Sequence, residues 1–202
     1  MMPARRTPLR AREAGFSMLE ILVSILIMVV GMLGFIGLQA RAQVAEVEAY
    51  QRGQALILVQ DMVDRLNTNR KAAGCYVITT SPSTGAPALG TGYGGTPTCT
   101  ASVGTTATRA VASNDLVEWN NALLGTTETL GGNPVGTILG ARGCVSYDAA
   151  TLQYRVAVAW QGLVPTVAPT VANAAATCGL NQYGNDAQRR EVSATLMIAV
   201  LN

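Results

Sequence analysis

The hydrophobic pattern begins with one long apolar run that contains a single charged residue. From Phe16 to Leu38 every residue is apolar, glycine or serine, except for Glu20. Roughly 20 apolar residues, at about 1.5 Å per residue, span the hydrocarbon core of a bilayer. The run therefore predicts a helix of membrane length, and a carboxylate inside such a helix is costly and usually functional.

Beyond Leu38 the same helical period continues, but on one side only. Apolar or small side chains recur at steps of three and four, which indicates an amphipathic helix. The stripe consists of Val44, Val47, Gln51, Ala55, Leu58, Met62 and Leu66. The pairs Glu48–Arg52 and Asp61–Arg65 have the acid first at i,i+4, the favourable order on a solvated face. No proline interrupts the chain between Pro8 and Pro82, so we expect one helix from Phe16 to about Asn69.

The C-terminal half carries the pattern of strands. Residues 152–161 alternate large apolar and smaller or polar side chains, which is typical of a half-buried strand. Residues 144–147 precede it across a hairpin-length connection, and residues 192–200 show a third alternation. We expect these three strands to form an antiparallel sheet whose large-residue face, with Tyr154 and Trp160, buries the helix stripe.

The residues between the long helix and the sheet give weaker signals. Residues 75–80 suit a short strand or an extended segment, and residues 81–108 have the glycine, serine and proline content of a loop. Ser113 is a plausible N-cap for a short helix to Leu123. Asp115 and Glu118 would then lie in its first turn, where acids suit the helix dipole. Residues 125–143 are again a glycine-rich connection.

The charge of the chain is concentrated at its start. The net charge is +2, from 14 basic and 12 acidic residues. Residues 1–15 hold four of the basic residues and one acid, so the remainder has 14 − 4 = 10 basic against 12 − 1 = 11 acidic residues, or −1. Arginines before an apolar run keep that end on the cytoplasmic side of a membrane. The remainder has no basic footprint for nucleic acid.

All four cysteines follow the apolar run, on the side that would lie outside the cytoplasm, where disulfides persist. An even number suits two bridges, and three pairings are possible. We favour Cys75–Cys99 and Cys144–Cys178, because each pair closes its own loop. A metal site is disfavoured, since no two cysteines have short ligand spacing and the chain has no histidine. Without histidine, and with a single lysine, the sequence also offers no nucleophile–base pair, so we expect neither an enzyme nor a cofactor.

A cleaved secretory signal is the main alternative for the N-terminus, and residues 40–42 imitate its cleavage pattern. The apolar run is longer than the usual hydrophobic region of such a signal, and it contains an acid. Helical patterning also continues through Ala42. We therefore disfavour this alternative.

The segment Gly15-Phe16-Ser17-Met18-Leu19-Glu20, with its basic leader and long apolar run, resembles the processing signal of type IV pilins and type II secretion pseudopilins. The resemblance implies cleavage after Gly15 by a prepilin peptidase and methylation of the new N-terminal Phe16. It also places the family's glutamate at Glu20. The domains would be a leader (1–15), a membrane or pilus-core half-helix (16–38), an amphipathic half-helix (39–70) and a periplasmic globular domain (71–202).

The order of elements also resembles type IV pilins. The implied fold is α+β, with a long N-terminal helix on a small antiparallel sheet and a disulfide-closed C-terminal loop. The hairpin that runs into residues 156–162, and residues 189–192, resemble those of minor pilins. The implied function is a minor pilin that primes or caps a type IV pilus used for twitching, adhesion or DNA uptake. A pseudopilin of type II secretion and a membrane-anchored periplasmic binding module are the alternatives.

The resemblance also implies partners and location. The partners would be other minor pilins, the major pilin, a tip adhesin, the prepilin peptidase and the inner membrane. The protein would first lie in the inner membrane with its bulk in the periplasm, and later in the extracellular pilus.

Glu20 suggests a mechanism for assembly. After cleavage, the amino group of Phe16 in one subunit would meet Glu20 of its neighbour, since an unpaired carboxylate in an apolar bundle is costly. The alternative is an acid tolerated near the membrane interface. Gly31, Gly34 and Gly37 allow either close helix contact or local melting, or simply reflect the abundance of glycine in membrane helices.

Overall fold

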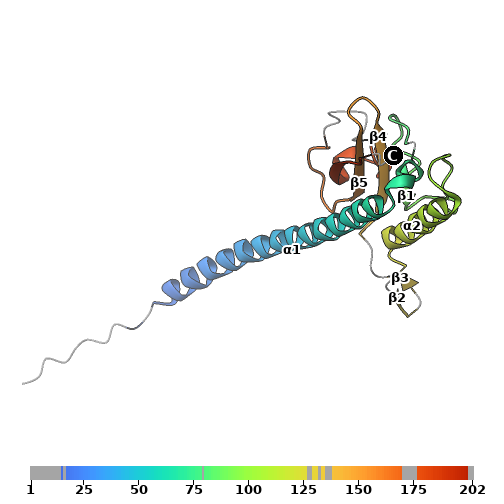
Figure 1. Ribbon diagram of the computed structural model, residues 1–202. Coiled ribbons are helices and arrows are strands. Elements are labelled where there is room, and N and C mark those ends of the chain that lie inside the picture. Colours follow the sequence, from blue (N-terminus) through green and yellow to red (C-terminus); the bar gives the residue numbers. More distant parts are fainter. Residues whose placement is uncertain are drawn as a thin grey trace, which may run out of the picture. The chain divides into compact units, whose positions relative to one another are not determined.

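The computed structural model describes residues 15, 17–78, 80–126, 129–131, 133–134, 138–169 and 177–199 of the chain. The chain divides into two compact units, Met1–Ala45 and Glu46–Asn202. The first unit contains the N-terminal part of helix α1 (Met18–Thr68). The second contains the rest of α1 and all other elements (Figure 1).

Helix α1 runs for 51 residues without a break, which confirms the single long helix expected from the sequence. In the second unit it buries one face. The buried positions are Gln51, Ala55, Val59, Met62 and Leu66. They recur every three or four residues, so they form one stripe along the helix. Val47, which the sequence pattern assigned to that stripe, is instead 45% exposed.

The segment after α1 differs from its prediction. A 3₁₀ helix, η1 (Arg70–Tyr76), takes up Cys75 and Tyr76, which were expected to be extended. The chain is extended only from Val77, and the backbone N–H of Ile78 donates to the carbonyl of Val145 at 2.8 Å. Tyr76 is thus the last residue of η1, whereas Val77 is extended. The side chain of Tyr76 lies in the core and has no exposed surface.

The sheet has four antiparallel strands in the order β1-β4-β5-β6. They are β1 (Leu89–Gly90), β4 (Arg142–Asp148), β5 (Gln153–Gln161) and β6 (Arg189–Met197). The three expected strands are confirmed, and β1 is an addition within the expected loop. A separate two-stranded ribbon joins β2 (Thr129–Leu130) and β3 (Asn133–Pro134). Val200, expected in the last strand, lies outside the described residues.

Both faces of the central strand β5 are buried, whereas the sequence pattern predicted one. Val156, Val158 and Trp160 join the core beneath α1. Ala157 and Ala159 lie on the other face, in a smaller cluster with the cystine of residues 144 and 178. The alternation of large and small residues in β5 therefore separates two buried layers. Leu152, expected at the start of the strand, lies in the turn before it with a φ of 56°.

Helix α2 (Thr106–Leu124) begins seven residues before the predicted N-cap, Ser113. Thr105 is the N-cap, and its side chain accepts from the backbone N–H of Thr108 in a capping box. Figure 1 shows α2 beside the C-terminal end of α1. There the indole N–H of the buried Trp119 donates to the carbonyl of Leu58 at 2.9 Å. Ser113 is inside the helix, where its hydroxyl donates to the carbonyl of Arg109.

Candidate functional site

The N-terminal part of α1 presents apolar side chains around its whole circumference. Ser17 caps its first turn, since its carbonyl accepts from the N–H groups of Glu20 and Ile21. The most apolar 18-residue window of α1 has a mean hydropathy of 2.8, and none of it is buried. Its length and composition suit a membrane span. Apolar surface of this extent requires a bilayer or partner helices.

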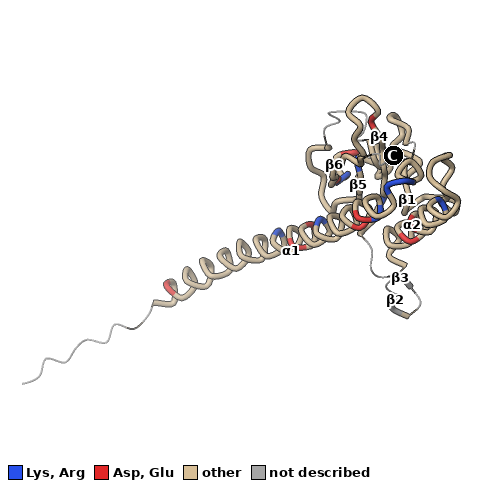
Figure 2. Tube along the Cα trace, in the orientation of Figure 1, with Lys and Arg blue, Asp and Glu red and all other residues tan. Residues whose placement is uncertain are grey.

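Glu20 lies in the first turn of this helix. Figure 2 shows an acid near the start of α1 followed by a long uncharged stretch, which in the sequence lasts until Arg41. The carbonyl of Glu20 accepts from the Ser24 hydroxyl at 2.7 Å. Its carboxylate has no ion pair among the described residues. Gly15 is described and exposed, whereas Phe16 lies outside the described residues.

The three glycines of this region are not required by contacts within the described chain. A methyl group added at Gly31, Gly34 or Gly37 would meet no atom within 4 Å. Glycine inside a helix costs roughly 1 kcal/mol relative to alanine. Any benefit that offsets this cost therefore comes from the surroundings of the helix or from its ability to melt locally.

The second unit fixes its share of α1 through a cluster of charges around Arg65. Its guanidinium contacts Asp61 at 3.0 Å, Asp115 at 2.9 Å and Glu118 at 2.7 Å. The two acids of α2 were expected to stabilise the first turn of their helix. They instead lie in its middle and bind α1, which corrects that interpretation.

Tyr76 and Asn69 extend this cluster into the core. The Tyr76 hydroxyl donates to the Asp115 carboxylate and accepts from the Asn69 side chain at 3.2 Å. Burial, and then the bond to Asp115, raise the pKa of Tyr76. Burial alone would lower the pKa of Arg65, but hydrogen bonds to Glu118, Asp61 and Asp115 outweigh it and raise the pKa overall. Arg65 therefore keeps its charge and Tyr76 keeps its proton to higher pH than the free side chains would.

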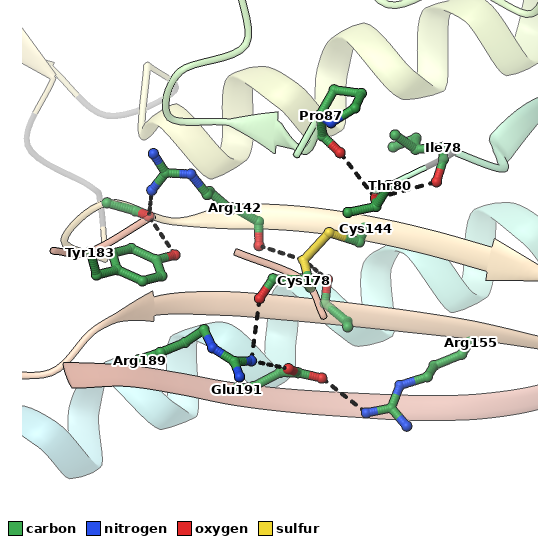
Figure 3. The surroundings of a disulfide bond; sticks show 12 residues. Ile78, Thr80, Pro87, Arg142, Cys144, Arg155, Cys178, Tyr183, Arg189 and Glu191 are labelled. Carbon is green, nitrogen blue, oxygen red and sulfur yellow. Dashed lines mark hydrogen bonds and ion pairs between the residues drawn. A yellow bond between two sulfur atoms is a disulfide. The ribbon is translucent and has the colours of Figure 1, made fainter. Parts of the chain in front are cut away.

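The two disulfides of the structure are Cys75–Cys99 and Cys144–Cys178, the pairs favoured from the sequence. The first ties η1 to the loop before α2. The second ties β4 to the segment that covers the outer face of β5 (Figure 3). Tyr183 in that segment donates to the carbonyl of Gly140 at 3.0 Å, and the Arg142 guanidinium lies 4.9 Å from its ring centroid. Burial raises the pKa of Tyr183 to about 12.

Arg189 lies fully buried beneath the same segment. Its guanidinium contacts Asp186 at 2.7 Å and Glu191 at 2.8 Å, and Figure 3 shows Glu191 between Arg189 and Arg155. The hydrogen bond from Arg189 holds the pKa of Asp186 below its usual value. A buried charge is stable only when paired in this way. In the sequence, residues 189–192 were notable only for their resemblance to those of minor pilins. The burial of Arg189 was not predicted, because a hydropathy pattern assigns arginine to the surface.

Glu48 joins α1 to the sheet on the other side. Its carboxylate accepts from Arg190 at 3.2 Å and from the backbone N–H of Leu163 at 3.2 Å. The sequence pattern had paired Glu48 with Arg52. The structure instead gives it a partner 142 positions away, because the ends of β5 and β6 lie against this part of the helix.

The side of α1 opposite the buried stripe is also apolar within the second unit. We call this side the outward stripe, and it consists of Glu46, Ala49, Tyr50, Gly53, Leu56 and Ile57. Tyr50 is 68% and Ile57 62% exposed. An amphipathic helix normally places polar residues on this side. Sequence reasoning missed this stripe, although its spacing of three and four residues was visible.

Within the described ranges, no group of three or more cysteine, aspartate or glutamate side chains could hold a metal ion. The charged groups that do meet, around Arg65 and Arg189, are paired with each other. They act as joints between elements of the fold.

Comparison with known proteins gives one match. The model of the family described as Tt1218-like, type IV pilin Tt1218, matches residues 37–115, from the middle of α1 to the middle of α2. No curated protein matches the chain, and no solved structure matches it. The fold, with a long apolar N-terminal helix, a four-stranded antiparallel sheet and two disulfides, is consistent with the type IV pilin fold. The family match over residues 37–115 and the fold together support a similarity to type IV pilin subunits.

Proposed function

We propose that the chain is a minor pilin of a type IV pilus, which helps to prime or cap the fibre. The observation that carries the proposal is the first half of α1, which is apolar on all sides, unburied, and charged only at Glu20. A permanent anchor needs no carboxylate at that depth. In a helix that leaves the membrane for a bundle of like helices, such a carboxylate can fix the alignment between neighbouring subunits.

In this proposal a peptidase cuts after Gly15, and Phe16 becomes the methylated N-terminus. The new amino group of one subunit pairs with Glu20 of its neighbour as the helix leaves the inner membrane. The pairing neutralises a carboxylate that hydrocarbon cannot solvate, so it favours one register over others. The domain of residues 71–202 lies in the periplasm before assembly and on the pilus afterwards.

Residues 156–162 and 189–192 resemble those of the minor pilin PilV, which favours a minor over a major subunit. The structural role of residues 189–192 is compatible with this resemblance, because Arg189 and Glu191 hold the C-terminal segment on the sheet. The partners in this proposal are other minor pilins, the major pilin and a tip adhesin. The pili serve twitching, adhesion or DNA uptake, and the chain itself is a structural subunit without catalysis.

The first test is processing. We expect the Gly15→Ala variant to remain an uncut precursor in the membrane, while the mature wild-type chain begins at a methylated Phe16. Mass spectrometry of the N-terminal peptide reads both results. A mature chain that begins at Gln43 would contradict the proposal, because it would indicate an ordinary secretory signal cleaved after Ala42.

The second test is incorporation. Glu20→Gln should leave processing intact but reduce recovery of the chain in sheared pili, because the pairing partner of the amino group is lost. Asp64→Asn is the matched control, since it removes an exposed acid from the same helix. Normal incorporation of the Glu20→Gln chain would exclude the pairing mechanism. Loss of twitching in a deletion strain supports a type IV pilus, and loss of secretion alone would indicate a pseudopilin.

A further inference from the structure

The core face of the sheet extends past the end of α1 and is open there. Val145 and Val156, which are neighbours across β4 and β5, have no exposed surface. The next pair on the same face is Tyr147 and Tyr154, whose rings lie 4.6 Å apart. Helix α1 ends at Thr68, so it does not cover this pair.

The uncovered end is a groove of about 920 Å³, which we call the end groove. Three parts of the second unit meet there: the segment after α1, the loop before α2, and the ends of the sheet strands. The residues that carry the argument below are Lys71, Val103, Tyr147, Leu152, Tyr154 and Met197. Large apolar side chains thus surround a space that the described chain leaves empty.

The composition of the lining favours a protein partner over a small molecule. Tyrosine, methionine and arginine are enriched in protein interfaces, and the groove has all three. A small-molecule site encloses most of its ligand's surface. The apolar side chains here are open to solvent, with Tyr147 at 42%, Leu152 at 58% and Met197 at 67% exposure. Open apolar surface of this kind marks a docking face.

The charge at the end groove is positive. Arg70 and Lys71 line it, both are exposed, and neither has an ion pair within the described ranges. None of the described residues that line the groove is acidic. Asp148 follows Tyr147 in β4, but its carboxylate accepts from Ala150 and Thr151 within the turn, each at 2.9 Å. A complementary partner therefore brings a carboxylate of its own.

Leu152 gives an independent sign of a contact. It has a φ of 56°, a backbone conformation that favours glycine or asparagine. A leucine there is strained, and its exposed side chain gains little from the chain's own core. Strained backbone of this kind clusters at functional contacts. A partner that covers the side chain would offset the strain.

The position of the groove along the chain favours a different protein as the partner. The groove lies beyond the C-terminal residue of α1, whereas the N-terminal half of α1 is the part proposed to enter the pilus core. In the proposed function, a priming or capping subunit is added first, and later subunits join it from the membrane through that N-terminal half. The end groove then has no further copy of this chain to meet.

We propose that the end groove receives a segment of a different chain, one that presents large apolar side chains close to a carboxylate. The apolar side chains pack on Tyr147 and Leu152, and the carboxylate pairs with Lys71. This inference rests on the proposed function, because a priming or capping subunit is the kind that needs an unlike partner. It adds the surface of contact and the chemistry of the segment that binds there.

The first test places a photoreactive group in the groove. Tyr147→benzoylphenylalanine, in the full chain in piliated cells, keeps an aromatic ring at this position. On illumination the ketone inserts into a neighbouring C–H bond and becomes an alcohol. We expect a product with a different protein, at a segment that has an acid within four residues of two large apolar residues. The same group at Val167, which is 88% exposed and outside the groove, should not yield this product.

The second test uses the single lysine of the chain, Lys71. A carbodiimide activates a carboxylate, and an amine in contact with it displaces the urea and forms an amide. We expect mass spectrometry to find Lys71 joined to an acid of the same segment that Tyr147 labels. A labelled segment without an acid, or a Lys71 product on a different protein from the labelled one, would overturn the proposal.

Matched variants separate the charge from the amine. Lys71→Arg keeps the charge and removes the amine, so it should abolish the amide product and preserve the photoproduct at Tyr147. Lys71→Glu should lower the photoproduct by about fivefold, because it sets two carboxylates against each other. Equal photoproduct from the two variants would show that charge does not select the partner.

A third variant separates the contact from folding. Leu152→Gly removes the exposed side chain and relieves the backbone, since glycine adopts this φ freely. It should not lower the Tm of the second unit, yet it should lower the photoproduct at Tyr147 by about fivefold. An unchanged photoproduct would show that Leu152 takes no part in the contact.

Failure of this contact is distinguishable from failure of the proposed function. If the chain is recovered in sheared pili and Tyr147 labels no other protein, or labels only a second copy of this chain, the partner of the groove is wrong and the pilin function stands. If both products form on one acidic segment while the chain is absent from sheared pili, the groove has the stated partner and the pilin function is wrong.

Discussion

The two halves of α1 share one helical period and bury their side chains in opposite ways. Between Met18 and Leu38 the helix is apolar on all sides and exposed on all sides. Between Gln51 and Leu66 one stripe is buried, and Arg65 beside it binds two acids of α2. The first half depends on what surrounds it, whereas the second depends on its own chain.

The difference shows what each half contributes. Hydrophobic free energy is released only when apolar surface leaves water. In the second half this occurs on folding, so side chains there stabilise the domain. In the first half the apolar surface stays exposed within the described chain, so side chains there should not affect the stability of the domain. Each prediction below tests this division.

The largest expected effect concerns the disulfide that ties β4 to the segment covering the outer face of β5. Replacing Cys144 and Cys178 together by serine removes a bridge with a sequence separation of 34. Loop-closure entropy for such a loop predicts a loss of about 4 kcal/mol in the free energy of unfolding. Urea unfolding followed by the fluorescence of Trp119 and Trp160, the two tryptophans of the chain, measures it. Membrane insertion of the variant should be normal, and a failure to insert would contradict the division.

The direct comparison uses two methionines of the same helix. Met62 is fully buried and Met28 is 66% exposed. Met62→Ala should lower the free energy of unfolding of the second unit by about 3 kcal/mol, because it leaves a cavity in the core. Met28→Ala should leave it unchanged within about 0.3 kcal/mol. Equal effects of the two substitutions in urea unfolding would refute the comparison.

Alkaline pH should destabilise the second unit alone. The pKa of Tyr183 is raised from 10.0 to about 12, so the folded state keeps its proton after the unfolded state has lost it. The stabilisation is complete below pH 10 and is lost as pH rises towards about 12, with a slope of about 1.4 kcal/mol per pH unit. Tyr76 and Tyr154, whose pKa values are also raised, add to the decline.

The Tyr183→Phe variant isolates this contribution. It should be about 1 kcal/mol less stable at neutral pH, since the hydrogen bond to Gly140 is lost, but its stability should decline less steeply above pH 10. The exposed Tyr50→Phe serves as control. Unfolding by urea at a series of pH values measures both slopes. An unchanged slope in Tyr183→Phe would show that Tyr183 does not carry the effect.

The smallest expected effect concerns the position along α1 at which its side chains begin to contact the domain. Glu48 binds Arg190 and the backbone of Leu163, and Glu46 binds neither. Glu48→Gln should cost about 1 kcal/mol in urea unfolding, because the pair is partly buried. Glu46→Gln should cost nothing measurable. A cost at Glu46 would mean that its carboxylate already serves the domain.

Much of the fold was predictable because its signals are local. The length of α1 follows from its helical period and from the absence of proline within it. The three main strands follow from the alternation of residues close together in sequence. The two disulfide pairs are those that we favoured from the sequence, on the ground that each closes its own loop. The start of α2 was misplaced, because Thr105 and Thr108 cap each other and a threonine pair is a weaker signal than the serine chosen.

The predicted residues near the start of α1 remain predictions. Glu20 lies on an exposed apolar helix, as expected, but its proposed partner belongs to another subunit. Phe16, the residue expected to be methylated, lies outside the described residues. No contact within one chain can test their roles, which is why the tests above use processing and incorporation.

By itself, the sequence determined the long helix and the three main strands, because helical and strand periods are properties of neighbouring residues. It also determined which half of α1 must find an apolar environment. Only the tertiary structure decided where the charges pair. Arg65 meets acids 50 and 53 positions away, and Arg189 is buried beneath a loop that covers the second face of β5. The energy of such pairs depends on distance and burial in space, which no local pattern records. The structure alone also decided that the sheet ends open beyond Thr68, beside Lys71.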